Sequence, residues 1–159
     1  AKKNIKSKNI ICVAPDVGGT ERARALGKIL GVELAIIDKR RPKPGQSKVM
    51  NVIGDVKSKT CIIVDDIIDS GGTIVNAAKA LKDRGAKEVY VYITHGVLTG
   101  EAIDKIKKSV IKKLVITDTI DNHIKIKDTK NIEVLPISTL MGEAIKRISN
   151  STSVSDLFK

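Results

Sequence analysis

Short apolar runs alternate along this chain with segments of helical periodicity, and this alternation constrains the fold more than any other feature. Runs of strand length occupy 9–14, 33–38, 49–54, 60–66, 88–94, 113–118 and 132–137. Helical spacing of apolar residues, Ile29 among them, marks 20–30, with Thr20 as the expected cap and Gly31 as the stop, and it also marks 99–109 and 138–149. A further helical segment ends at Gly85 and carries Ile74, Ala77, Ala78 and Leu81 on one face. Strands that alternate with helices in this way predict a doubly wound α/β fold, with a mainly parallel sheet and helices on both faces.

The composition is that of one soluble domain. Of 159 residues, 42% are hydrophobic and 30% are charged. The apolar runs are far shorter than the roughly 20 residues that a membrane span needs, and no secretion signal is evident, so we expect a cytoplasmic protein with no membrane partner. Cys12 and Cys61 fall in predicted strands, which indicates reduced core thiols. We expect a linker over 1–8, a domain over 9–149 and a polar tail over 150–159.

The net charge of +11 raises the question of nucleic-acid binding. The basic residues are scattered along the chain, and two tyrosines and one phenylalanine scarcely supply a stacking platform for bases. A basic surface suits a phosphate-rich small substrate equally well. We therefore predict no nucleic-acid partner.

The stretch VDDIIDSGGT, residues 64–73, carries the clearest chemistry. Asp65 and Asp66 end a predicted strand, where ligands bind in doubly wound sheets. The turn that follows leads into a helix, and its glycines and free N–H groups suit an anion such as a phosphate. The acids suit sugar hydroxyls or a divalent metal. The spacing matches neither a Walker A loop nor a G-x-G-x-x-G loop. A plain strand end followed by an ordinary helix start is the alternative.

The longer stretch CIIVDDIIDSGGT, residues 61–73, resembles the phosphoribosyl-pyrophosphate-binding signature of type I phosphoribosyltransferases and phosphoribosyl pyrophosphate synthetases. Three other segments resemble the synthetases. VAPDVGGTERAR (13–24) is similar to their S-P-D-x-G-G-x-x-R-A segment, with Ala14 in place of Ser. IIDKRRPKP (36–44) is similar to their flexible catalytic loop, and SVSDLF (153–158) to their C-terminal ending. The resemblance covers only the second of that family's two similar halves.

The resemblance implies the C-terminal catalytic domain of a ribose-phosphate diphosphokinase, with a type I phosphoribosyltransferase-like fold. That family uses ribose 5-phosphate, ATP and Mg²⁺ and is typically homo-oligomeric. The implied roles are catalysis for Lys39 and Arg41, and metal binding for Asp16. Ribose 5-phosphate binding falls to Arg41, Asp65, Asp66, Asp69, Ser70, Gly71, Gly72 and Thr73, and a regulatory site to Ser153, Ser155 and Phe158. The family's first half supplies the adenine pocket, so the resemblance implies that these residues alone are inactive.

Two other functions stay open at this point. The first is a non-catalytic regulatory paralogue or an isolated ribose-phosphate-binding module. The second is a type I phosphoribosyltransferase, although no segment suggests its nucleobase-binding hood. Single residues have simpler interpretations too. The alternative for Asp16 is a turn-forming residue without a ligand, and the alternative for Lys39 is a solvated basic loop. We expect His95 to be structural, and we assign no role to His123.

Overall fold

The computed structural model describes residues 9–40 and 49–158. Within them a seven-stranded sheet has the order β3-β2-β1-β4-β5-β6-β7. Its strands are β1 (Ile10–Ala14), β2 (Glu33–Arg40), β3 (Val49–Ile53), β4 (Thr60–Ile68), β5 (Glu88–Gly96), β6 (Lys113–Thr117) and β7 (Ile132–Leu135). Only the pairing of β3 with β2 is antiparallel. The predicted doubly wound, mainly parallel sheet is thus confirmed.

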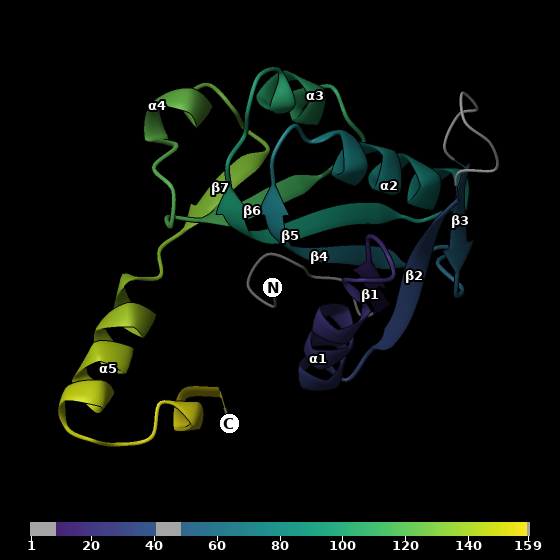
Figure 1. Ribbon diagram of the computed structural model, residues 1–159. Helices are drawn as coiled ribbons and strands as arrows, with labels where there is room; N and C mark the ends of the chain where they lie inside the picture. Colours follow the sequence, from purple (N-terminus) through teal and green to yellow (C-terminus); the bar gives the residue numbers. More distant parts are fainter. Residues whose placement is uncertain (1–8, 41–48, 159) are drawn as a thin grey trace.

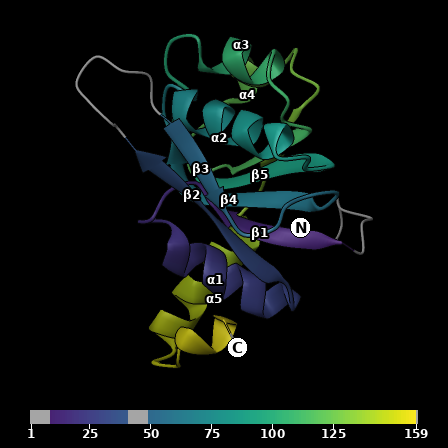
Figure 2. The same ribbon diagram turned by 90° about the vertical axis from the view of Figure 1, so that its right-hand side faces the viewer.

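The helices lie on both sides of this sheet (Figure 1). They are α1 (Thr20–Leu30), α2 (Gly72–Asp83), α3 (Ala102–Lys107), α4 (His123–Ile126) and α5 (Ser138–Ser149), and η1 (Ser155–Phe158) is a 3₁₀ turn. In both views α2 and α3 cover one face and α1 covers the other, whereas α5 extends away from the sheet (Figure 2). None of the side chains of α5 is buried.

The larger part of the hydrophobic core lies between the sheet and α2. The predicted inward face of this helix is confirmed, because Ile74, Ala77, Ala78 and Leu81 are all buried. Fully burying one large aliphatic side chain stabilises a fold by about 1.5–3 kcal/mol. The other face has a smaller cluster around Ile62 and Tyr90, against which Leu26 and Leu30 of α1 pack.

Local sequence chemistry explains where the first helix begins and ends. Gly31 follows α1 in the left-handed conformation at φ 67°, as its position predicts. Thr20, which we expected to cap the helix, is instead its first residue, and its hydroxyl donates to the carbonyl of Val17 over 2.7 Å. Gly19 is the N-cap residue, so that expectation was wrong by one position. Ile29, at the predicted apolar spacing, is 74% exposed.

Two helical features differ from the sequence pattern. The predicted helix over 99–109 is confined to α3, because Gly100 adopts a left-handed φ of 52° before it and the Ser109 hydroxyl bonds to the Ile106 carbonyl after it. The short helix α4 was not predicted.

Cys12 and Cys61 are buried and free, as expected. Within the described ranges, no helix has the length and apolar character to cross a membrane.

Candidate functional site

A pocket of 330 Å³ opens beyond the carboxyl ends of β1 and β4. These strands are parallel neighbours, so the turn after Ala14 and the turn after Ile68 reach the same edge of the sheet. The pocket is lined by Asp16, Asp65, Ile67, Ile68, Asp69, Ser70, Gly71, Gly72, Thr73 and Ile74. The fold therefore brings one acid from the first turn together with the acids, glycines and hydroxyls of residues 65–73.

The floor of this pocket is a glycine turn at the N-terminus of α2. Gly71 caps the helix at φ 76°, a left-handed conformation, and no side-chain hydrogen bond caps the helix. The first intrahelical acceptor is the Gly71 carbonyl, which binds the N–H of Val75 over 3.0 Å. The N–H groups of residues 72–74 thus lack an intrahelical acceptor and lie at the positive end of the helix dipole. This geometry suits an anion.

The loop after β5 supports the glycine turn from the side. The Thr99 hydroxyl donates to Asp69 Oδ1 over 2.5 Å, and the Thr99 N–H donates to the Asp69 carbonyl over 3.2 Å. Val97 N–H bonds to the Ile68 carbonyl over 3.0 Å. Thr99 was missed by the sequence analysis. A hydroxyl just beyond the strand that pairs with β4 is the one signal that could have suggested it.

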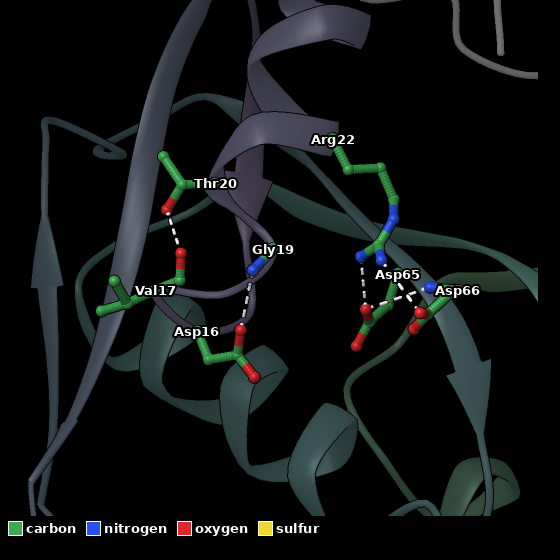
Figure 3. A network of polar contacts seen from close by, with 7 residues as sticks. All are labelled: Asp16, Val17, Gly19, Thr20, Arg22, Asp65 and Asp66. Carbon is green, nitrogen blue, oxygen red and sulfur yellow. Dashed lines mark hydrogen bonds and ion pairs between the residues drawn. The ribbon is translucent and has the colours of Figure 1, made fainter.

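The acid pair Asp65 and Asp66, in the last part of β4, is bound by an arginine from the first helix (Figure 3). Arg22 Nη1 lies 2.6 Å from Asp65 Oδ1, and Nη2 lies 3.0 Å from Asp66 Oδ2. The side chain of Asp65 is 19% exposed and that of Asp66 is 60% exposed. Only Asp65 of the two lines the pocket. Arg22 belongs to the VAPDVGGTERAR segment that resembles the synthetases, but the sequence assigned it no role in the site.

The two carboxyls differ in proton affinity. Burial raises the pKa of Asp65, and the nearby charge of Asp66 adds to this, although the backbone N–H of Asp66 and the charge of Arg22 oppose it. Burial also acts on Asp66, but the Arg22 charge and the hydrogen bond from Asp65 outweigh it and lower the pKa of Asp66. Asp65 therefore holds a proton more readily than Asp66.

Asp16 lies in the turn after β1, where it has a structural role and also borders the pocket. Its Oδ1 accepts a 2.9 Å hydrogen bond from the Gly19 N–H, so it shapes the turn, and it also lines the pocket. The described part of the chain has no group of three or more His, Cys, Asp or Glu side chains placed to hold a metal. Mg²⁺ usually binds through one or two carboxylates together with substrate phosphates and water. The carboxylate of Asp16, beside an anion cradle, fits a cation that arrives with its substrate.

A family model described as the phosphoribosyl synthetase-associated domain matches residues 40–159. The chain belongs to the phosphoribosyl synthetase family. The ribose-phosphate pyrophosphokinase of Hyphomonas neptunium is 56% identical over 158 residues, which are 99% of this chain and 51% of that protein. The Brucella melitensis relative is 55% identical with the same two coverages. The chain thus spans about half the length of the curated relatives, in agreement with the predicted C-terminal half.

Solved structures agree with this family membership. The phosphoribosylpyrophosphate synthetase from Mycobacterium smegmatis has a TM-score of 0.81 and 35% identity, over 90% of this chain and 46% of that one. The adenine phosphoribosyl transferase from Trypanosoma brucei has a TM-score of 0.54 over 67% of this chain and 52% of that one. At 18% identity, this second likeness shows the fold alone.

The other predicted site residues of this synthetase-family chain that lie within the described ranges do not line the pocket. Lys39 lies half-buried near the end of β2, opposite Met50 of β3, and Arg41 lies outside the described residues. Ser153, Ser155 and Phe158 are exposed beyond α5, where Arg147 Nη1 donates to the Ser153 carbonyl over 2.9 Å. His95 Nδ1 lies 2.9 Å from Thr119 Oγ1, a contact that agrees with a structural role.

Proposed function

We propose that this chain forms the ribose-5-phosphate half of the active site of a ribose-phosphate diphosphokinase. In this reaction the anomeric hydroxyl of ribose 5-phosphate attacks the β-phosphorus of ATP, the pyrophosphoryl group is transferred, and AMP leaves. The observation that carries the proposal is the single pocket that collects Asp65 and residues 69–73 at the carboxyl edge of the sheet. The names and half-length coverage of the curated relatives support it.

The glycine turn would hold the 5-phosphate. The N–H groups at the start of α2 and the hydroxyls of Ser70 and Thr73 are its donors, and each charge-assisted hydrogen bond contributes about 1.5–3 kcal/mol. Gly72 leaves room for the ligand, since a Cβ placed there would meet no atom of the described residues within 4 Å. Asp69, held by Thr99, borders the same space.

The acids would bind the sugar. Asp65 accepts hydrogen bonds from ribose hydroxyls, which orients the anomeric oxygen for in-line attack, and Asp66 assists from its more exposed position. Lys39 and Arg41 neutralise the triphosphate as the β-phosphorus is attacked. Asp16 would hold Mg²⁺, which supplies further neutralisation of phosphate charge when bound.

Several features of the whole enzyme belong to the same proposal. We infer a cytoplasmic homo-oligomer in which Ser153, Ser155 and Phe158 help to bind a regulatory anion between subunits. ATP is the co-substrate, and its adenine pocket comes from the other half of the protein. The net charge of +11 suits such phosphate-rich ligands.

Calorimetric titration with ribose 5-phosphate tests the binding site. The wild-type chain should bind, and Asp69→Ala and Thr73→Val should each weaken binding by about tenfold or more, because each removes a group that borders or binds the phosphate. Thr139→Val is the matched control, since Thr139 is exposed on α5 away from the pocket. Equal binding by all four proteins would contradict the assignment.

An activity assay tests the reaction itself. The chain is combined with the N-terminal half of a relative, and AMP formation from ATP and ribose 5-phosphate is measured with Mg²⁺. We expect activity in the mixture and much less with either part alone. A mixture that assembles but forms no AMP would favour the non-catalytic paralogue instead.

A further inference from the structure

We propose that Arg22 is a positioning residue of the ribose site, which orients Asp65 toward the sugar by binding Asp65 Oδ1 and Asp66 Oδ2 together. This inference rests on the proposed function, because it concerns the acid that would accept the ribose hydroxyls. It adds a residue from α1 whose side chain acts through Asp65 and does not itself line the pocket.

The geometry of the contact makes Arg22 a rigid support. Arg22 lies 43 residues from Asp65 in the sequence, in the first turn of α1, and its guanidinium bridges the two acids with one terminal nitrogen each (Figure 3). A guanidinium is planar, so its two terminal nitrogens have a fixed separation and direction. The bridge therefore fixes the carboxylates of Asp65 and Asp66 relative to each other and to α1.

The two oxygens of the Asp65 carboxyl have different surroundings. Oδ1 accepts from Arg22 Nη1 over 2.6 Å and from the Asp66 N–H over 3.0 Å. In the part of the chain that the structure describes, both donors to the Asp65 carboxyl reach Oδ1, and Oδ2 accepts no hydrogen bond. The terminal torsion of an aspartate is broad when unconstrained. Two donors on one oxygen restrict that rotation, and the other oxygen is left for a ligand in the pocket that Asp65 lines.

The acidic residues around Asp65 give Arg22 a second role, which is to compensate negative charge. Asp16 and Asp69 line the same pocket as Asp65, Asp66 is adjacent on β4, and His95 of β5 pairs with Ile67 in register. Carboxylates that border one pocket repel each other when all are ionised. The guanidinium of Arg22 compensates one of these charges, which favours an ionised Asp65 as a hydrogen-bond acceptor.

The test compares two ligands on four proteins. Wild type, Arg22→Gln, Arg22→Lys and Arg24→Gln are titrated by calorimetry with ribose 5-phosphate and, separately, with inorganic phosphate. Arg24 is an exposed residue of the same helix, so it controls for the loss of one positive charge. Thermal unfolding checks that each variant folds, and the ¹³C resonance of the Asp65 carboxyl reports its orientation and ionisation directly.

Arg22→Gln should weaken ribose 5-phosphate binding by about tenfold while inorganic phosphate binding changes by less than about twofold, because the phosphate turn is untouched. Arg22→Lys keeps the charge but lacks the planar guanidinium, so its affinity for ribose 5-phosphate should lie between those of wild type and Arg22→Gln. Arg24→Gln should bind both ligands as wild type does. The Asp65 carboxyl resonance should move in Arg22→Gln and stay in Arg24→Gln.

Three results would overturn the inference while leaving the proposed function in place. They are equal ribose 5-phosphate binding by wild type and Arg22→Gln, an equal loss for both ligands, and an unmoved Asp65 resonance. The proposed function itself fails in a different way, namely when the wild-type chain binds no ribose 5-phosphate, and the inference then fails with it.

Discussion

The hydroxyl of Thr99 donates a 2.5 Å hydrogen bond to Asp69 Oδ1, and this contact joins the loops that follow two neighbouring parallel strands. Backbone hydrogen bonds from Val97 and Thr99 to Ile68 and Asp69 run beside it. The side of the proposed phosphate site is therefore held by the loop after β5 as well as by its own turn.

Replacing Thr99 with valine should test this support. Thr99→Val keeps the shape of the side chain but removes the donor to Asp69. We expect ribose 5-phosphate affinity to fall by about three- to tenfold, with little change in stability because both residues are exposed. Calorimetry and chemical denaturation measure the two quantities, and Thr139→Val serves as the control. Unchanged affinity would mean that Asp69 needs no support from the neighbouring loop.

The two glycines at the start of α2 should respond differently to alanine. Gly71 has φ 76°, so Gly71→Ala should lower the free energy of unfolding by about 1–2 kcal/mol. Gly72 is the first helical residue and faces open pocket space, so Gly72→Ala should leave that free energy unchanged or raise it by up to about 1 kcal/mol. Its Cβ should nevertheless obstruct the ligand and weaken ribose 5-phosphate binding.

Urea denaturation and calorimetry on both variants check this pair. Each glycine controls for the other, since the same methyl group is added at adjacent positions. A loss of stability in Gly72→Ala equal to that in Gly71→Ala would contradict the different backbone roles.

Gly96, the last residue of β5, is packed against Ile116 of β6. A Cβ at Gly96 would lie 2.7 Å from Ile116 Cδ1 and 3.1 Å from Cγ2. Gly96→Ala should therefore destabilise the fold by about 1–3 kcal/mol through overpacking. Ile116→Val removes Cδ1, so the double variant should lose less stability than the sum of the two single changes. Urea denaturation of the four proteins measures this coupling, and strict additivity would be the contrary result.

The two thiols should be protected in the folded protein. Burial raises the pKa of Cys12 to about 11 and that of Cys61 to about 12, from an ordinary 9.0. At pH 8 a thiol reagent should label both only after unfolding in denaturant. Labelling of the native chain at the rate of free cysteine would show that a thiol is accessible.

The same shifts predict how stability depends on alkaline pH. The unfolded chain ionises its thiols near pH 9, whereas the folded chain keeps them protonated until about 11 and 12. Their contribution to stability is thus complete below pH 9 and is lost as the pH rises through the folded values. Replacing both cysteines with alanine should remove this part of the decline, as denaturation at several pH values would reveal.

The sequence by itself determined the sheet class, the buried face of α2 and the closeness of Asp65 to residues 69–73 at one edge of the sheet. These features follow from local rules. Strands and helices differ in the period of their apolar residues, and a glycine turn before a helix leaves free N–H groups that suit an anion. The same rules erred where single contacts decide an outcome, as at Thr20 and at the ends of α3.

Only the tertiary structure decided which distant side chains complete that site. Arg22 reaches Asp65 across 43 residues, and Thr99 reaches Asp69 across 30. The local sequence around Arg22 or Thr99 does not specify which acid each residue contacts. The contacts exist because α1 packs beside β4 and because β5 is the parallel neighbour of β4, so that their ends meet at one edge of the sheet. Strand order and helix packing, which periodicity does not encode, selected the partners of both acids.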